Sequence, residues 1–181
     1  MTQSAFSLRF PLTELGIWAE RYLQNNLGST QDNVPENIVG PAVKSRGYMT
    51  KEELAAIAHW KSPRIRKHIA SNDPQHVEEL TRVALATNVE PLRIQALLIL
   101  SGVCWPVASV ILHFCHTDPY PVLDFRALWT CGLNKPPDYK FEFWWNYVLL
   151  TRKLREQTGF SMRTIDRALW QYSKEKQEAL N

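Results

Sequence analysis

Residues 97–132 read LLILSGVCWPVASVILHFCHTDPYPVLDFRALWTCG, and this stretch is the most informative about the fold. It predicts an apolar helix that breaks at Ser101-Gly102, a few turn residues, and a second apolar helix over 107–115. A Pro-rich loop then leads to Asp124, a single carboxylate between two apolar residues. Two helices joined by a glycine-containing turn can present backbone N–H groups to one phosphate. The pattern therefore indicates an enzyme that holds a nucleic-acid backbone and acts on one nucleotide.

Two short motifs within this stretch carry a resemblance to a known family. Residues 100–108 read LSGVCWPVA and residues 121–124 read PVLD. They resemble the helix-hairpin-helix DNA glycosylase superfamily, whose members commonly read L-P-G-V-G-x-x-x-A, followed by two apolar residues and the catalytic aspartate. Asp124 follows Pro106 by 18 residues (124 − 106), which is similar to the interval in endonuclease III and adenine glycosylase. A weaker similarity is IAHWKSPR over 57–64, and the whole resemblance covers about residues 50–135.

The apolar spacing predicts helices along almost the whole chain and no strand. Together with the resemblance, this implies an all-α, glycosylase-like bundle of about eight to ten helices with a central cleft. We expect one compact domain over 1–181, divisible into two lobes. One lobe would hold the hairpin, over about 50–135, and the other would join 1–49 to 136–181.

Several helix starts are visible as local signals. Thr50 and Glu53 have the spacing of a capping box. The pairs Ser62-Pro63, Asp73-Pro74 and Glu90-Pro91 each place a proline at the start of a predicted helix. The residues predicted to stand at helix starts are Thr50, Ser62, Asp73, Glu90 and Ser161. A polar loop is expected over 28–36 and a short helix within 38–48.

The departures from the family pattern limit the implied chemistry. Cys104 stands at the second hairpin glycine and Ser101 at the usual proline. Pro106 stands where bifunctional members have the lysine nucleophile, which argues against lyase activity. No cysteine follows Cys131, so we expect no iron–sulfur cluster, no structural zinc and no cofactor.

The resemblance implies a monofunctional DNA glycosylase that flips a damaged or modified base out of double-stranded DNA. Asp124 would be the catalytic carboxylate, and water would be the nucleophile. The predicted DNA-binding residues are Gly102, Val103, Cys104, Trp105, Lys61, Arg64 and Arg126. The alternative is a catalytically inactive helix-hairpin-helix DNA-binding or assembly module. An enzyme acting on modified bases of foreign DNA is a third hypothesis.

Each of these residues also has a plain structural interpretation. Asp124 can simply cap the helix that follows it, because Asp is a favoured N-cap residue. The basic run from Lys61 to Lys67 can be a solvated helix face. Trp105 can pack under the turn as well as lie against DNA.

Composition and charge limit the classes of partner and the cellular setting that we expect. The net charge of +3 and the isoelectric point near 8.8 permit nucleic-acid binding without requiring it. Three cysteines without C-x-x-C spacing favour a reducing, cytoplasmic setting, and the start of the chain shows no signal peptide. The uncharged run 96–115 could suggest a membrane span, but Ser101, Gly102 and Pro106 interrupt it. We expect a monomer that binds no membrane.

Overall fold

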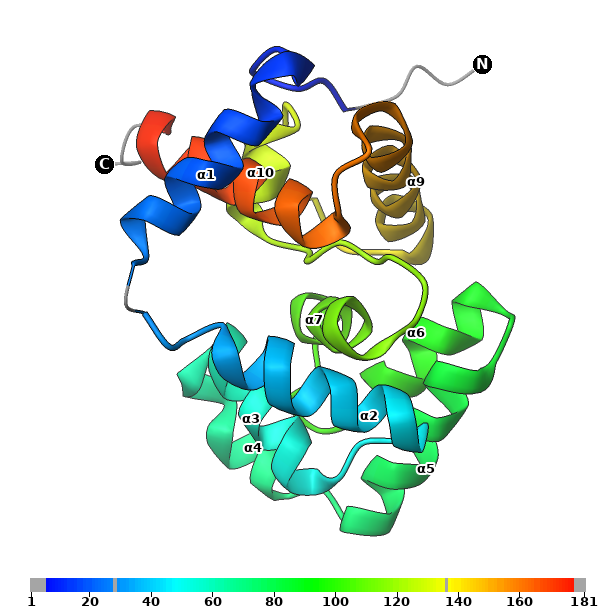
Figure 1. Cartoon of the computed structure of the whole chain (residues 1–181). Helices are drawn as coiled ribbons and strands as arrows, with labels where there is room; N and C mark the ends of the chain where they lie inside the picture. Colours follow the sequence, from blue (N-terminus) through cyan, green and yellow to red (C-terminus); the bar gives the residue numbers. More distant parts are fainter. Residues whose placement is uncertain (1–5, 28, 136, 178–181) are drawn as a thin grey trace. The chain divides into compact units, whose positions relative to one another are not determined.

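The computed structural model describes residues 6–27, 29–135 and 137–177 (Figure 1). Over these ranges the chain is helical and forms no β-strand, which confirms the predicted all-α class and the expected number of helices. The α-helices are α1 (Leu15–Asn25), α2 (Gly40–Arg46), α3 (Lys51–Lys61), α4 (Arg66–Ala70), α5 (Pro74–Ala86), α6 (Glu90–Leu98), α7 (Trp105–Cys115), α8 (Phe125–Thr130), α9 (Phe141–Thr158) and α10 (Met162–Lys176). Two 3₁₀-helices, η1 (Leu12–Glu14) and η3 (Pro63–Ile65), and one π-helix, η2 (Val34–Val39), complete the described elements.

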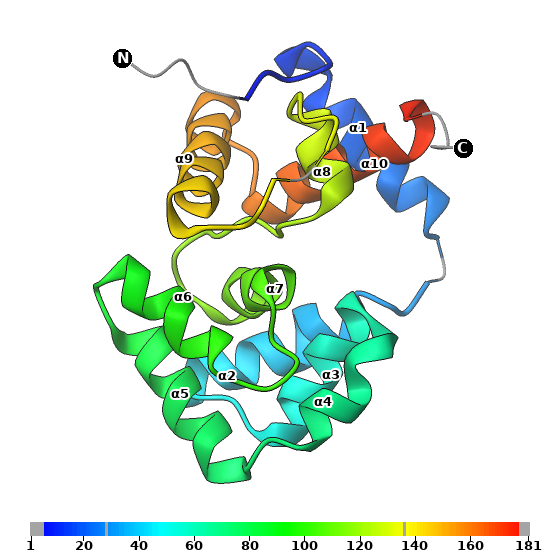
Figure 2. The same ribbon diagram turned by 180° about the vertical axis from the view of Figure 1, so that it is seen from behind.

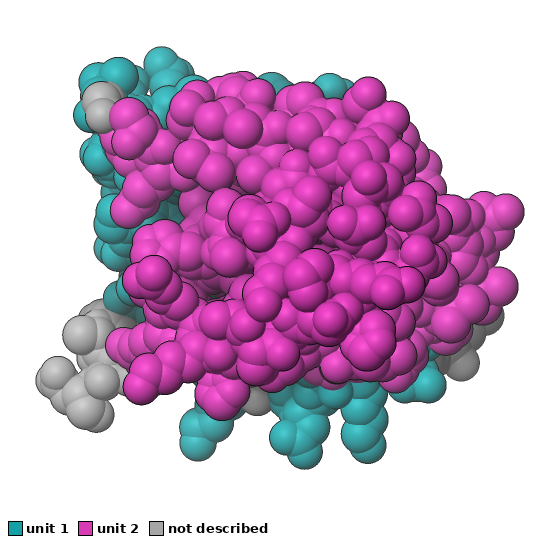
Figure 3. All heavy atoms as spheres, turned by 90° about the horizontal axis from the view of Figure 1, so that it is seen from below, with its two compact units in different colours: residues 1–28, 120–181 teal, residues 29–119 magenta. Residues whose placement is uncertain are grey.

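The chain divides into two compact units, which Figure 3 colours separately. Residues 29–119 form the hairpin unit, and residues 1–28 with 120–181 form the terminal unit. These bounds differ from the lobes expected at 50–135 and at 1–49 with 136–181. The difference arises because η2 and α2 pack on α3 and α7, whereas α8 packs on α10. Asp124 therefore belongs to the terminal unit.

Within the hairpin unit, helix α7 contacts α2, α3 and α6 (Figures 1 and 2). Its side chains from Val107 to Cys115 are buried except for His113. The uncharged run is broken as predicted, because α6 ends at Leu98 and α7 begins at Trp105. Among the described residues, no helix is long and apolar enough to span a membrane.

Most of the predicted helix starts are confirmed. Thr50 and Glu53 form the reciprocal capping box, and Glu90 opens α6. The Asp73 carboxylate accepts from the His76 N–H at 3.1 Å. The Ser161 hydroxyl accepts from the Thr164 N–H at 3.1 Å.

One local prediction was confirmed in position only, and one was wrong. Ser62 is the N-cap and Pro63 the first residue of η3, which leads directly into α4, but the Ser62 side chain makes no capping hydrogen bond with any described residue. The loop expected to reach residue 36 ends at Val34, where η2 begins. Pro35 is buried in that π-helix, so tertiary packing extends helical structure into a polar segment.

In the terminal unit, α10 contacts α1, α8 and α9, with α1 and α8 beside it in Figure 2. The extended N-terminal segment pairs with the end of α8. The Ser7 N–H donates to the Cys131 carbonyl and the Arg9 N–H to the Thr130 carbonyl, both at 2.9 Å. Gly132 allows this approach, because a Cβ atom there would lie 2.9 Å from the Ser7 carbonyl oxygen. The segment thereby fixes the helix that Asp124 begins.

A buried arginine and histidine join α6 to the end of α7. The Arg93 guanidinium, 3% exposed, donates to the Ala84 carbonyl at 2.6 Å and lies 2.6 Å from His116 Nε2. His116 Nδ1 accepts from the Asp118 N–H at 2.9 Å. Burial lowers the pKa of His116, and the Arg93 charge lowers it further. Both ring nitrogens thus face N–H groups, which disfavours the imidazolium form.

This buried pair predicts a loss of stability in acid. Below the unfolded-state pKa of about 6.5, the unfolded chain takes up a proton that folded His116 resists until its own lower pKa is reached. The contribution of His116 to stability is therefore complete above about pH 6.5. It falls by at most about 1.4 kcal/mol per pH unit below that value. Urea unfolding from neutral pH to pH ~5 should show a shallower decline for His116→Gln than for the wild type.

The control is His76→Gln, which changes an exposed histidine of the same unit. It should lose stability in parallel with the wild type. Identical declines for wild type, His116→Gln and His76→Gln would exclude the buried histidine as the source.

Candidate functional site

The turn between α6 and α7 depends on one glycine. Gly102 has φ +79°, a left-handed conformation that favours glycine. A Cβ atom at Gly102 would also lie 2.9 Å from His68 Cβ and 3.2 Å from the Ile69 backbone nitrogen. The turn therefore needs glycine both for its conformation and for its close contact with α4.

Asn72 fixes this turn, and the sequence reasoning missed it. Its side-chain oxygen accepts from the Ser101 N–H at 2.8 Å. Its side-chain NH₂ donates to the carbonyls of Ser101, at 2.9 Å, and Ile69, at 3.0 Å. One buried amide thus satisfies both backbone polar groups of Ser101. The only sequence signal is an Asn before the Asp73-Pro74 helix start, which does not identify a partner 29 residues away.

Not every hairpin amide predicted to bind phosphate is available in this conformation. The Val103 N–H donates to the Leu100 carbonyl at 3.0 Å, the Val103 side chain is buried, and Pro106 has no N–H. The phosphate-binding prediction therefore concerns the amides of Gly102 and Cys104. Helices leave their first N–H groups without intrahelical acceptors, which makes this end suitable for an anion.

Cys104 fits the turn without strain, although it stands where the family pattern has a glycine. Its φ is −92° and its ψ 173°, an extended conformation that any residue adopts, and it stands at the N-cap of α7. The Cys104 carbonyl accepts from the Ala108 N–H at 2.9 Å. Cys104 is exposed and Trp105 half-buried, and Ile99, at the end of α6, is 70% exposed. The sequence reasoning did not single out Ile99.

The basic run lies beside this turn. Lys61 ends α3, Arg64 lies in η3, and Arg66 and Lys67 begin α4, whose His68 contacts Gly102. Arg64, Arg66 and Lys67 are exposed, and none of them forms a salt bridge within the described ranges. No acidic residue occurs from position 54 to 72. The hairpin turn is therefore flanked by concentrated positive charge within one unit.

Asp124 caps helix α8. Its Oδ1 accepts from the Arg126 N–H at 2.9 Å, and its carbonyl accepts from the Leu128 N–H at 2.9 Å. The four residues before it are buried, whereas Asp124 is half-buried. The capping interpretation is thus confirmed, and it is compatible with a catalytic role, which stays a prediction.

A buried hydroxyl lies close to the extended segment before Asp124. The Tyr147 hydroxyl donates to the Val122 carbonyl at 3.4 Å. Burial raises the pKa of Tyr147 well above its ordinary value, and nearby acidic groups, including Cys131, Asp166 and Asp124, add smaller contributions. Tyr147 therefore stays protonated at neutral pH.

Arg126 lies over aromatic rings. Its guanidinium carbon is 5.2 Å from the ring centre of Phe125 and 5.7 Å from that of Trp170. The contact with Trp170 holds the Arg126 side chain against α10, and the role of Arg126 in DNA binding stays a prediction.

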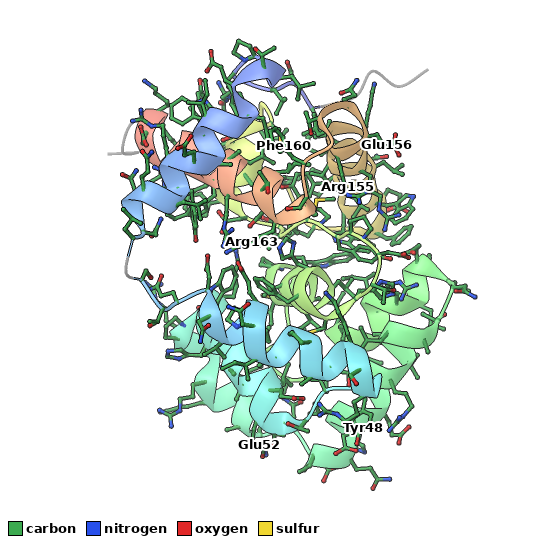
Figure 4. All side chains as sticks on the ribbon, viewed as in Figure 1. Tyr48, Glu52, Arg155, Glu156, Phe160 and Arg163 are labelled. Atoms are coloured by element: carbon green, nitrogen blue, oxygen red, sulfur yellow. The ribbon has the colours of Figure 1, made fainter. Side chains whose placement is uncertain are left out.

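On α10, Arg163 (labelled in Figure 4) forms a salt bridge with Asp166 at 2.5 Å.

The predicted site residues thus fall in two groups. The hairpin unit holds Lys61, Arg64 and the four hairpin residues, and the terminal unit holds Asp124 and Arg126. The structure brings the hairpin and the basic run together by direct packing of Gly102 on α4.

The cysteines do not gather. Cys104 is exposed, and burial raises the pKa of Cys115 and of Cys131 to about 12, so both thiols are protonated at neutral pH. Within 6–27, 29–135 and 137–177, no group of three or more His, Cys, Asp or Glu side chains is suited to hold a metal ion.

Comparison of the chain with protein-family models, with curated proteins and with solved structures found no match.

Proposed function

We propose that this protein binds double-stranded DNA through the α6–α7 turn and the adjacent basic run, and that it hydrolyses the N-glycosidic bond of a damaged or modified base. The observation that carries the proposal is the packing of Gly102 against His68 and Ile69. It holds the N-terminal end of α7 beside the exposed cations of η3 and α4.

The binding step follows from these two features. Backbone N–H groups at a helix start hold one phosphate without reading sequence, and neighbouring Lys and Arg side chains hold further phosphates. The release of counterions from these phosphates supplies sequence-independent affinity. A protein that inspects many positions for one altered base needs this kind of binding.

The chemical step is assigned to Asp124. As the bond between C1′ and the base nitrogen breaks, the bonding electrons leave with the base and positive charge develops on the deoxyribose. A carboxylate near C1′ stabilises this charge and accepts a proton from the water that attacks C1′. The base must leave the duplex for this reaction, so the protein flips the nucleotide. The products are the released base and an abasic site in an intact strand.

A second candidate is a helix-hairpin-helix DNA-binding or assembly module without catalysis. The capping bond from the Arg126 N–H to Asp124 favours it, because this bond explains an Asp at that position without any chemistry. Only an assay of base release separates the two candidates.

The binding part is tested by salt dependence. The triple variant Arg64→Gln, Arg66→Gln, Lys67→Gln should bind an undamaged duplex more weakly than the wild type. The slope of the logarithm of its association constant against the logarithm of the salt concentration should be less steep by up to about 0.9 for each phosphate that the variant no longer neutralises. Fluorescence anisotropy over a range of salt concentrations measures both quantities.

A matched control removes the same charge from three exposed positions of the terminal unit, through Lys140→Gln, Lys153→Gln and Arg155→Gln. This variant should keep most of the wild-type salt dependence. If both triple variants lose the same affinity, the effect is one of net charge, and the basic run is not the binding surface.

A further inference from the structure

The hairpin unit contains a pocket of about 480 Å³ that the proposed chemistry does not use. It is built from the segment before η2, from η2 itself, and from the end of α3 with η3. Its lining residues are Thr30, Gln31, Val34, Pro35, Ala56, His59, Trp60 and Pro63. Its volume is in the range of small-molecule sites, and a mostly apolar lining with a few polar groups is typical of them.

Trp60 is a fixed wall of this pocket. Its indole N–H donates to the Asp32 carboxylate at 3.1 Å. Its ring meets Phe114 edge to face, with the ring centres 5.2 Å apart. An indole held on two sides in this way is preorganised to receive a flat ring, because little side-chain freedom is lost on binding. The proline and valine side chains add apolar surface.

The basic run follows the α3 and η3 residues of the pocket along the chain, and one acidic group in contact with the lining, Asp32, accepts from the Trp60 indole N–H. Trp60 is followed directly by Lys61, and Pro63 by Arg64, with Arg66 and Lys67 next along the chain. A pocket with an aromatic wall, whose lining residues Trp60 and Pro63 are each followed in the chain by a cation, matches a ligand with a flat heterocycle and phosphates. The row extends beyond the pocket, which suits a chain of phosphates better than a single nucleotide.

We propose that this pocket receives one unstacked base of single-stranded DNA, with the neighbouring phosphates held by the basic run from Lys61 to Lys67. The inference rests on the DNA binding proposed for that run and gives the hairpin unit a second, base-dependent mode of contact. Thr30, Gln31 and His59 supply hydrogen-bonding groups for the edge of the base.

The test fills the pocket without removing any of its walls. Ala56 lines the pocket on α3, whereas the neighbouring Ala55 is exposed and does not line it. Ala56→Leu and Ala55→Leu therefore form a matched pair in the same helix with the same good helix former. Anisotropy compares two labelled strands of about 12 nucleotides, one with normal bases and one with tetrahydrofuran abasic units throughout.

The wild type and Ala55→Leu should bind the base-bearing strand roughly 10-fold more tightly than the abasic strand, as expected for one stacked base. Ala56→Leu should lose this preference and bind both strands with the wild-type affinity for the abasic one. Trp60→Leu, followed by circular dichroism to check folding, should lose it as well. A fully retained preference in Ala56→Leu would overturn the inference.

Two further outcomes separate this inference from the proposed function. If the triple Gln variant of the basic run loses binding to duplex and strands while Ala56→Leu behaves as the wild type, the pocket is wrong and the DNA surface stands. If the triple variant changes nothing, the proposed DNA surface itself is wrong. Wild-type binding of dAMP as tight as that of the strand would overturn the assignment to a strand.

Discussion

Replacement of Asp124 by asparagine is expected to slow base release by roughly 10²-fold or more, while DNA binding stays equal or becomes tighter. Asn caps helices as well as Asp does, so the hydrogen bond from the Arg126 N–H to position 124 is kept. The substitution therefore removes the charge and not the cap. Loss of a negative charge near phosphates does not weaken association. Base release from DNA carrying a panel of lesions and modifications measures the first effect, and anisotropy the second.

The matched control is Asp73→Asn, which makes the same change at the N-cap of α5 in the hairpin unit. It should release base at the wild-type rate. With Pro106 in the first turn of α7, wild-type product should be an alkali-labile abasic site that borohydride does not trap. Full base release by Asp124→Asn would exclude catalysis by this carboxylate. A borohydride-trapped adduct would show that a lysine elsewhere is the nucleophile.

Replacement of Gly102 by alanine is expected to destabilise the hairpin unit by about 2–5 kcal/mol. The left-handed conformation costs a non-glycine residue about 1–2 kcal/mol, and overpacking adds about 1–3 kcal/mol. The second contribution arises because the new Cβ would meet His68 Cβ at 2.9 Å. Urea or thermal unfolding measures the loss.

Gly47→Ala is the control that separates the two costs. Gly47 has φ +84°, but a Cβ atom there would meet nothing within 4 Å. It should therefore cost only about 1–2 kcal/mol. If both variants lose the same free energy of unfolding, α4 shifts to accommodate the added methyl group at position 102. Any effect of Gly102→Ala on DNA affinity must be measured where the variant is folded, since the same contact supports both the turn and the basic run.

Local sequence signals were enough to predict where most helices begin and where the uncharged run breaks. The caps at Thr50, Asp73 and Ser161 were predictable because an N-cap side chain bonds to an amide only two or three residues ahead. The burial of α7 was predictable because its residues are apolar on nearly every side. The hairpin break was predictable because Ser101, Gly102 and Pro106 interrupt an otherwise apolar run.

The surroundings of these elements followed from long-range packing alone. Asn72 holds Ser101, and Trp60 bonds to Asp32 to form the pocket wall, across separations of 29 and 28 residues. The assignment of Asp124 to the terminal unit likewise depends on the packing of α8 against α10. Such contacts have no local signature, because an amide, a carboxylate or a glycine can satisfy its needs with many partners. Which partner it meets is fixed by how the buried faces of distant helices pack together.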